Sequence, residues 1–146
     1  MEAPLKTVYL CGAINGKTDA ECNDWRAEAK RLLCGAGYST IDPMRRDFRG
    51  REEDSYAEIV LGDLDDIDAA DFLLVNAGAP SWGTAMEVFH AYTIGKKVVV
   101  FTDAPRVSPW LRQCSHFICD SLERACVAVM NYDVMVAESG ASHEQL

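Results

Sequence analysis

Apolar and amphipathic segments alternate along the chain, and this alternation predicts its secondary structure. Short apolar or β-prone runs predict strands at residues 7–11, 38–42, 72–76, 97–101 and 116–119. Apolar residues that recur at helical spacing predict helices at residues 24–33, 55–68 and 122–130. A further helix is expected to carry Glu87 in its first turn and to end near Ile94, where Gly95 follows.

Strands that alternate with helices form a parallel sheet with right-handed crossovers, so an α/β fold is expected. We expect a three-layer, doubly wound, flavodoxin-like domain with a parallel sheet of about five strands. In that strand order the first and third strands are neighbours, and the loops at residues 12–17 and 77–84 face each other across one cleft. The domain is expected to span residues 1–137, and residues 138–146 to form a polar, frayed tail.

Composition narrows the classes of partner. The 146 residues carry a formal net charge of −9, which argues against binding a nucleic-acid polymer through its phosphates. No apolar run approaches the roughly 20 residues of a membrane helix, and the first residues lack a secretion-signal pattern. The six cysteines form no C-x-x-C pair and no zinc-ligand spacing, so free thiols and a cytoplasmic location are expected.

The most informative stretch is the turn at residues 81–86, which leads to Glu87 after the apolar strand at residues 72–76. Ligands of open α/β sheets bind at the carboxyl ends of strands. A carboxylate there can act as a nucleophile or a base, and the N–H groups of the turn can hold an anion. Asp63 could point over the same edge of the sheet. Tyr9, near the end of the first strand, is either a core aromatic residue or part of this site.

Two loops could bind a phosphate, and each has a plainer interpretation. The loop at residues 12–17 has two glycines and Lys17, but it matches neither the dinucleotide-binding nor the P-loop motif, so it is a phosphate loop or a plain turn. Residues 45–51 form a basic cluster in an acidic chain. That cluster is either a solvated loop or a lid that helps to attract a phosphate.

Several segments together resemble the nucleoside 2-deoxyribosyltransferase superfamily over roughly residues 7–110. They are V-Y-L-C-G-A-I-N-G at residues 8–16, G-D-L at 62–64 with Ile67 and Ala70-Asp71, S-W-G-T-A-M-E at 81–87, A-Y at 91–92 and G-K-K-V at 95–98. Ser81 and the R-V-S segment at residues 106–108 resemble the branch of 2'-deoxynucleoside 5'-phosphate N-hydrolases, whereas transferases usually carry an acidic residue at the position of Ser81. Those hydrolases have an arginine where this chain has Asn15.

The resemblance implies a double displacement in which Glu87 attacks C1' of the sugar and Asp63 protonates the leaving base. Tyr9 would hydrogen-bond Glu87 or the sugar. The residues implied to bind the 5' end of the substrate are Gly12, Ile14, Asn15, Gly16, Lys17, Ser81, Gly83 and Ser108. The resemblance also implies a homodimer or larger homo-oligomer, in which Ser108 reaches a neighbouring subunit's phosphate, and no metal or cofactor.

The resulting hypothesis is an N-glycosidase that cleaves the base–sugar bond of a (deoxy)nucleoside 5'-monophosphate through a glycosyl-enzyme intermediate on Glu87. The first alternative is a nucleoside 2-deoxyribosyltransferase that exchanges bases between deoxynucleosides. The second is a non-catalytic nucleotide-binding module of the same fold, which would keep the cleft but would not need Glu87.

Overall fold

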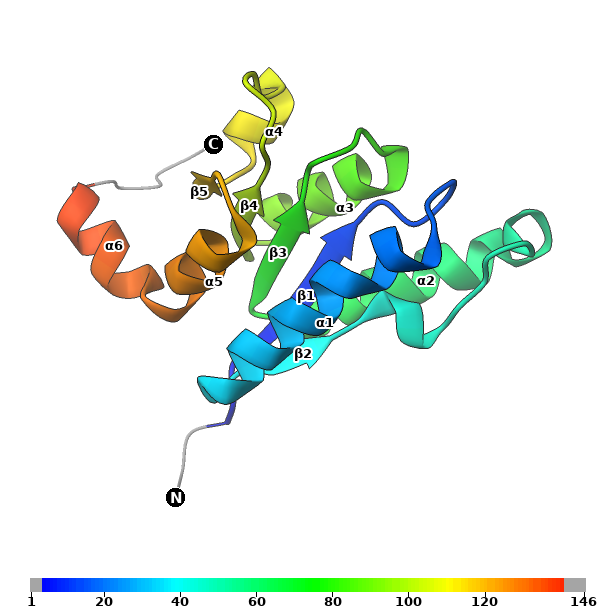
Figure 1. The fold of residues 1–146 in the computed structure, drawn as a ribbon, viewed down its shortest axis with the longest axis horizontal. Helices are drawn as coiled ribbons and strands as arrows, with labels where there is room; N and C mark the ends of the chain where they lie inside the picture. The colour runs from blue at the N-terminus through cyan, green and yellow to red at the C-terminus, as the bar shows by residue number, and fades with distance from the viewer. Residues whose placement is uncertain (1–3, 141–146) are drawn as a thin grey trace.

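A parallel five-stranded sheet forms the centre of the molecule in the computed structural model, which describes residues 4–140 (Figure 1). The strands are β1 (Thr7–Gly12), β2 (Ser39–Ile41), β3 (Phe72–Asn76), β4 (Lys97–Phe101) and β5 (Phe117–Cys119), in the order β2-β1-β3-β4-β5. All four neighbouring pairs are parallel. The predicted flavodoxin-like fold is therefore confirmed, with β1 and β3 adjacent.

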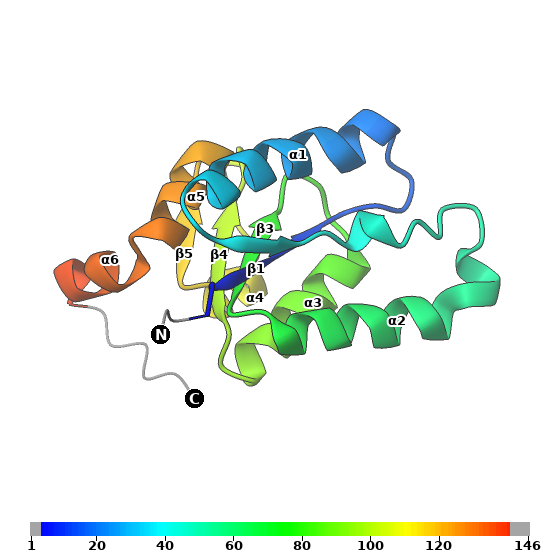
Figure 2. The same ribbon diagram turned by 90° about the horizontal axis from the view of Figure 1, so that it is seen from below.

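Helices cover both faces of the sheet, which makes three layers (Figure 2). One face is covered by α1 (Asp19–Gly35), α5 (Leu122–Met130) and α6 (Tyr132–Ser139), and the other by α2 (Glu52–Ala69), α3 (Trp82–Thr93) and α4 (Pro109–Gln113). A short 3-10 turn, η1 (Pro43–Arg45), follows β2.

The strands are buried on both faces, so consecutive side chains enter two separate cores. Val8 and Leu10 of β1 pack with Leu33 of α1 and Val129 of α5. Tyr9 and Cys11 point to the opposite face and belong to the core under α2 and α3. This alternation places the Tyr9 side chain on the α3 side of the sheet.

Side-chain caps make two helices longer than the apolar spacing predicts. The α1 helix begins at Asp19 because Thr18 and Glu21 form a reciprocal capping box. The α3 helix begins at Trp82 because the Ser81 hydroxyl accepts a hydrogen bond from the Thr84 N–H. The expectation that Glu87 lies in the first turn of its helix is thus wrong, since Glu87 lies in the second.

The C-terminal region contains a helix that the sequence pattern did not predict. The α6 helix runs to Ser139 and is followed by Gly140 in a left-handed conformation. The expected frayed tail therefore does not begin at Glu138, and its remainder, residues 141–146, lies outside the described residues. Within residues 4–140 no helix is long and apolar enough to cross a membrane.

Candidate active site

A pocket of about 190 Å³ lies at the carboxyl end of the sheet, where β1 and β3 are neighbours. The loops after β1 and β3 leave the sheet at this end and turn to opposite faces, toward α1 and α3 (Figure 1). The α2 helix and the loop before it complete the wall. The lining residues are Gly12, Ile14, Asn15, Pro43, Met44, Arg46, Asp47, Phe48, Arg49, Glu52, Ile59, Asp63, Ser81, Gly83, Thr84 and Glu87.

Glu87 is the carboxylate that α3 places against the end of β1. The Tyr9 hydroxyl donates a hydrogen bond of 2.5 Å to Glu87 Oε2, and the Cys11 thiol lies 4.0 Å from Oε1. Because Tyr9 and Cys11 alternate with core residues of the other face, β1 itself aims both side chains at Glu87. A buried phenol thus fixes the orientation of the carboxylate.

Burial is the main influence on the charge of Glu87 and Tyr9. It raises the pKa of Glu87 to about 7. The hydrogen bond from Tyr9 and the charge of Arg26 lower this pKa, and the charge of Asp63 raises it further. The pKa of the Tyr9 phenol is raised far above its usual range by burial and by Glu87, so Tyr9 stays a donor. The dipole of α3 favours ionised carboxylates in the first turn, and it does not outweigh the effect of burial because Glu87 lies in the second turn.

Asp63 reaches the same pocket from α2, as the sequence suggested. Its Oδ1 accepts a hydrogen bond of 3.2 Å from Arg46 Nη2. Burial raises the pKa of Asp63, and the neighbouring arginine opposes that rise. The pocket therefore contains two carboxyl groups with raised pKa values, which is the usual sign of an acid–base or nucleophilic site.

The structure brings five of the eight expected binding residues to the pocket. These are Gly12, Ile14, Asn15, Ser81 and Gly83. Among the described residues, Gly16, Lys17 and Ser108 do not line it. Lys17 lies 4.0 Å from Glu21 on α1, and Ser108 caps the N-terminus of α4 by accepting a hydrogen bond from the Trp110 N–H.

The close packing behind Gly12 explains why a glycine is needed there. A Cβ atom at this position would lie 2.9 Å from Cζ2 of Trp25 and 3.2 Å from Cβ of Asn76. Arg26 is fully buried and donates hydrogen bonds to the carbonyls of Leu10, Cys22 and Gly12. This arginine, which the apolar pattern did not mark as buried, ties the end of β1 to α1.

The loop after β2 contributes several residues to the pocket. Arg46, Phe48 and Arg49 belong to the basic cluster at residues 45–51, which the sequence offered as a lid but did not resolve into individual residues. Met44 lies outside that cluster and was missed. Thr84 was also missed. Its buried hydroxyl has no hydrogen-bond partner among the described residues, apart from a weak contact with the Cys11 thiol. A buried unpaired hydroxyl beside a pocket is suited to bind a polar group of a ligand.

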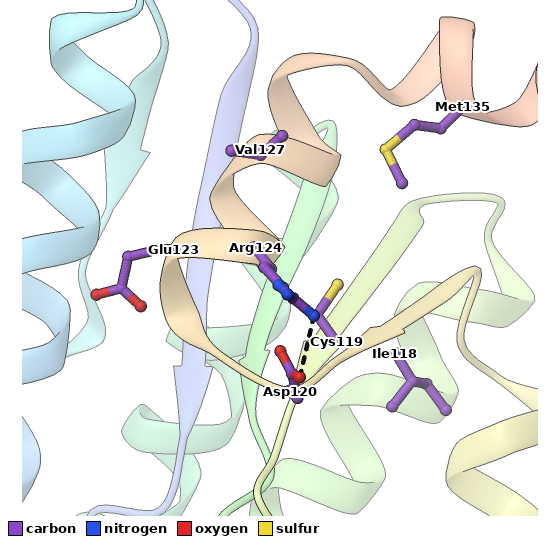
Figure 3. Close-up of a pocket in the computed structure, with 7 residues that line it drawn as sticks. All are labelled: Ile118, Cys119, Asp120, Glu123, Arg124, Val127 and Met135. Atoms are coloured by element: carbon purple, nitrogen blue, oxygen red, sulfur yellow. Dashed lines mark hydrogen bonds and ion pairs between the residues drawn. The ribbon is translucent and has the colours of Figure 1, made fainter.

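A second cavity, of about 570 Å³, lies at the other edge of the sheet between β5, α5 and α6 (Figure 3). It contains an ion pair of 3.1 Å between Arg124 and Asp120, and Ile118, Val127 and Met135 supply much of its apolar wall. None of the residues expected to act in catalysis or binding lines it. The pocket at the carboxyl ends of β1 and β3 is therefore the candidate active site.

Comparison with known proteins shows the fold and the family. No curated protein matches the chain by sequence. Among solved structures, the 2-deoxyribosyltransferase of the psychrotolerant bacterium Bacillus psychrosaccharolyticus superposes with a TM-score of 0.68 at 20% identity, covering 89% of this chain and 94% of that one. A conserved protein from Enterococcus faecalis V583 superposes equally well, with a TM-score of 0.68 at 17% identity, covering 88% and 99%. At these identities the two structures establish the fold.

The family is established by sequence. The model of the nucleoside 2-deoxyribosyltransferase family matches residues 8–144, which include every strand and helix described above except the first residue of β1. Members of this family are enzymes that act on small nucleoside substrates. The chain therefore belongs to the nucleoside 2-deoxyribosyltransferase family.

Proposed function

We propose that the protein is an N-glycosidase that cleaves the base–sugar bond of a (deoxy)nucleoside 5'-monophosphate. The observation that carries this proposal is the partly buried Glu87 carboxylate, held by Tyr9 and sharing one pocket with Asp63. A retaining glycosidase uses two carboxyl groups in one pocket, one as the nucleophile and the other as the acid and base. Here the leaving group is a base nitrogen rather than a sugar oxygen.

In the first step an oxygen of ionised Glu87 attacks C1' of the sugar, and the C1'–N bond breaks with its electrons moving to the base. Asp63 donates its proton to the departing base. In the second step water attacks C1', its proton passes to the Asp63 carboxylate, and Glu87 is released. Tyr9 holds Glu87 in place through both steps.

The N-terminal end of α3 is the proposed phosphate site. Ser81, Gly83 and Thr84 line the pocket there, where free N–H groups and the helix dipole favour an anion. Lys17 does not line the pocket, whereas Arg46 and Arg49 do. Arg46 pairs with Asp63, a catalytic candidate, so we propose Arg49 as the cation. Arg49 would exchange its ion pairs with Asp47 and Asp19 for the phosphate, and the pair with Asp19 links its loop to α1.

Base exchange between deoxynucleosides is the second candidate, and the family match favours it. The two reactions share the attack by Glu87 and differ in the acceptor, which is water in one and a second base in the other. The glycosidase is preferred because the pocket combines Ser81 with arginines rather than an acidic residue at that position. Such a wall suits a substrate with a negative 5' end.

We also propose that two copies of the chain associate through α3 and α4. Trp82 and Trp110 are 86% and 74% exposed, and Met86 and Phe89 extend the apolar surface between them. Phe89 and Trp110 pack edge to face with centroids 6.2 Å apart. A surface of this kind marks an interface. Ser108 does not line its own pocket and lies two residues from Trp110, which is consistent with the proposal that it reaches the partner's pocket.

The reaction is tested by chromatography of free base after incubation with deoxynucleosides and their 5'-monophosphates, each with and without a second base. Base release from monophosphates alone supports the glycosidase, and a new nucleoside formed only with added base supports the transferase. Glu87→Ala should abolish release while isothermal calorimetry still detects binding, whereas Glu123→Ala, at an exposed site on α5, should retain activity. Release that persists in Glu87→Ala would exclude the proposed mechanism.

The association is tested by light scattering on the wild type and on Trp110→Ser. We expect a dimer or larger assembly for the wild type and a shift toward monomer for the variant. A monomeric wild type at micromolar concentration would contradict the proposed association and the role of Ser108.

A further inference from the structure

Arg46 is held between two carboxylates of α2. Its Nη2 donates to Asp63 Oδ1 at 3.2 Å and to Asp66 Oδ2 at 2.7 Å. Arg45 donates to both oxygens of Asp66, at 2.9 and 2.8 Å. Asp66 is therefore fixed by two guanidinium groups, and it anchors Arg46 independently of Asp63.

Gly62 makes room for this arrangement. It lies in the interior of the 18-residue helix α2, where glycine is less favourable than alanine. A Cβ atom at Gly62 would lie 3.0 Å from Arg46 Nη2 and 3.1 Å from its Cζ and Nε. The guanidinium thus occupies the space that an ordinary helix residue would fill. The residue of low helix propensity, Gly62, thus lies where the Arg46 side chain packs against α2, directly before Asp63.

From this geometry we infer that Arg46 is the positioning residue that fixes the orientation and charge of Asp63. Gly62 leaves the space that the Arg46 guanidinium occupies, and Asp66 holds it there by a hydrogen bond. The importance of Asp63 for the reaction rests on the proposed function, but its contact with Arg46 does not. Asp63 has no other hydrogen-bond partner among the described residues. Without Arg46 its carboxyl group would be free to turn within the pocket.

Charged and titratable groups surround Asp63 on four sides. Arg45 lies at the end of η1 and Arg46 directly follows it. Asp66 lies on the same helix as Asp63, Tyr9 and Cys11 lie on β1, and Glu87 lies on α3. Burial and Asp66 favour the protonated form of Asp63, and Arg46 favours the carboxylate. Of these groups Arg46 is the cation in direct contact with Asp63.

The shared contact suits a group that must both give and take a proton. The bond from Arg46 to Asp66 is shorter than the bond to Asp63. When Asp63 is protonated and its contact with Arg46 weakens, Asp66 keeps the guanidinium in place. When Asp63 has given its proton to the base, Arg46 is still adjacent to stabilise the new carboxylate.

The decisive experiment is an NMR titration of the Asp63 side-chain carboxyl carbon, assigned by its loss in Asp63→Asn. We expect the pKa of Asp63 to rise by about 1 in Arg46→Met, because the nearest positive charge is lost. Arg46→Lys keeps the charge without the planar fork, so its value should fall between those of the wild type and Arg46→Met.

Gly62→Ala provides the sharper variant, because it moves the flexible guanidinium without removing its charge. It should raise the pKa of Asp63 by less than Arg46→Met does, because the positive charge is displaced rather than lost, while the melting temperature stays the same or rises through better helix propensity. Gly35→Ala is the matched control, since it adds the same methyl group at the end of α1 with nothing within 4 Å. It should leave the Asp63 titration unchanged.

An unchanged Asp63 titration in both Arg46→Met and Gly62→Ala would overturn the inference. The base-release assay separates this from failure of the proposed function. If the titration moves but no substrate releases its base, the role of Arg46 stands and the proposed reaction fails. If base is released through Glu87 while the titration does not move, only the role of Arg46 fails.

Discussion

Tyr9 and Glu87 are 78 residues apart in the chain, and a hydrogen bond of 2.5 Å joins the phenol of one to the carboxylate of the other. The contact forms because β1 and β3 are adjacent and α3 returns across the face toward which Tyr9 points. It links the end of one strand to the second turn of a helix. The first two predictions follow from this pair.

Tyr9→Phe should impair base release most strongly at low pH. The Tyr9 hydrogen bond lowers the pKa of Glu87, so its removal should raise that pKa above about 7 and reduce the ionised fraction. We expect kcat/KM of Tyr9→Phe to be about tenfold below the wild type at pH 6 and to approach it above pH 8, since a one-unit rise corresponds to about tenfold. A ratio of the two kcat/KM values that does not vary with pH would contradict this explanation.

Glu87→Gln should stabilise the protein increasingly as pH rises. The folded pKa of Glu87, about 7, lies above its ordinary value of 4.5, so the wild type loses stability as pH rises through this interval. The glutamine variant lacks that loss. We expect its advantage in free energy of unfolding to grow by about 2–3 kcal/mol between pH 5 and pH 8. Urea denaturation at both pH values measures it, with the exposed Glu123→Gln as control. If the difference in free energy of unfolding between Glu87→Gln and the wild type is the same at both pH values, ionisation of Glu87 does not destabilise the folded protein.

Arg26→Met should destabilise the fold. Arg26 is fully buried and donates to three backbone carbonyls, which would lose their charged donor. Removing hydrogen bonds to a buried charged group costs about 2–4 kcal/mol. Arg31→Met on the same helix removes an exposed pair with Glu28 and should cost less than about 0.5 kcal/mol. Similar midpoints of urea denaturation for the two variants would show that Arg26 contributes little.

Ser81→Asp should separate phosphate binding from folding. Aspartate caps helices as well as serine does, so the melting temperature should change little. The added negative charge at the start of α3 should reduce kcat/KM for a monophosphate about tenfold or more and leave an unphosphorylated nucleoside nearly unaffected. Parallel kinetics on both substrates measure the difference. Equal losses on the two substrates would place the phosphate elsewhere.

The fold and the centre of the site could be predicted because each depends on local pattern. The strand at residues 72–76 has the predicted limits, since four consecutive apolar residues followed by Asn76 are typical of a short strand buried on both faces. In the flavodoxin-like strand order that we expected and the structure has, the carboxyl ends of β1 and β3 are neighbours. The resemblance suggested the roles of Tyr9, Asp63 and Glu87. In the structure Asp63 and Glu87 line one pocket, and Tyr9 lies behind Glu87 and donates a hydrogen bond to it.

Only the tertiary structure decided the other features. The charge of Glu87 depends on its burial against the end of β1, which forms only when α3 packs on the sheet. Lys17 and Ser108 lie outside the pocket because their directions depend on loop conformation, which hydrophobic spacing does not encode. Arg26 and Arg46 look like surface residues in the sequence. Their buried or bridging positions arise from carbonyls and carboxylates that lie far away in the chain and approach only when the sheet and its helices pack.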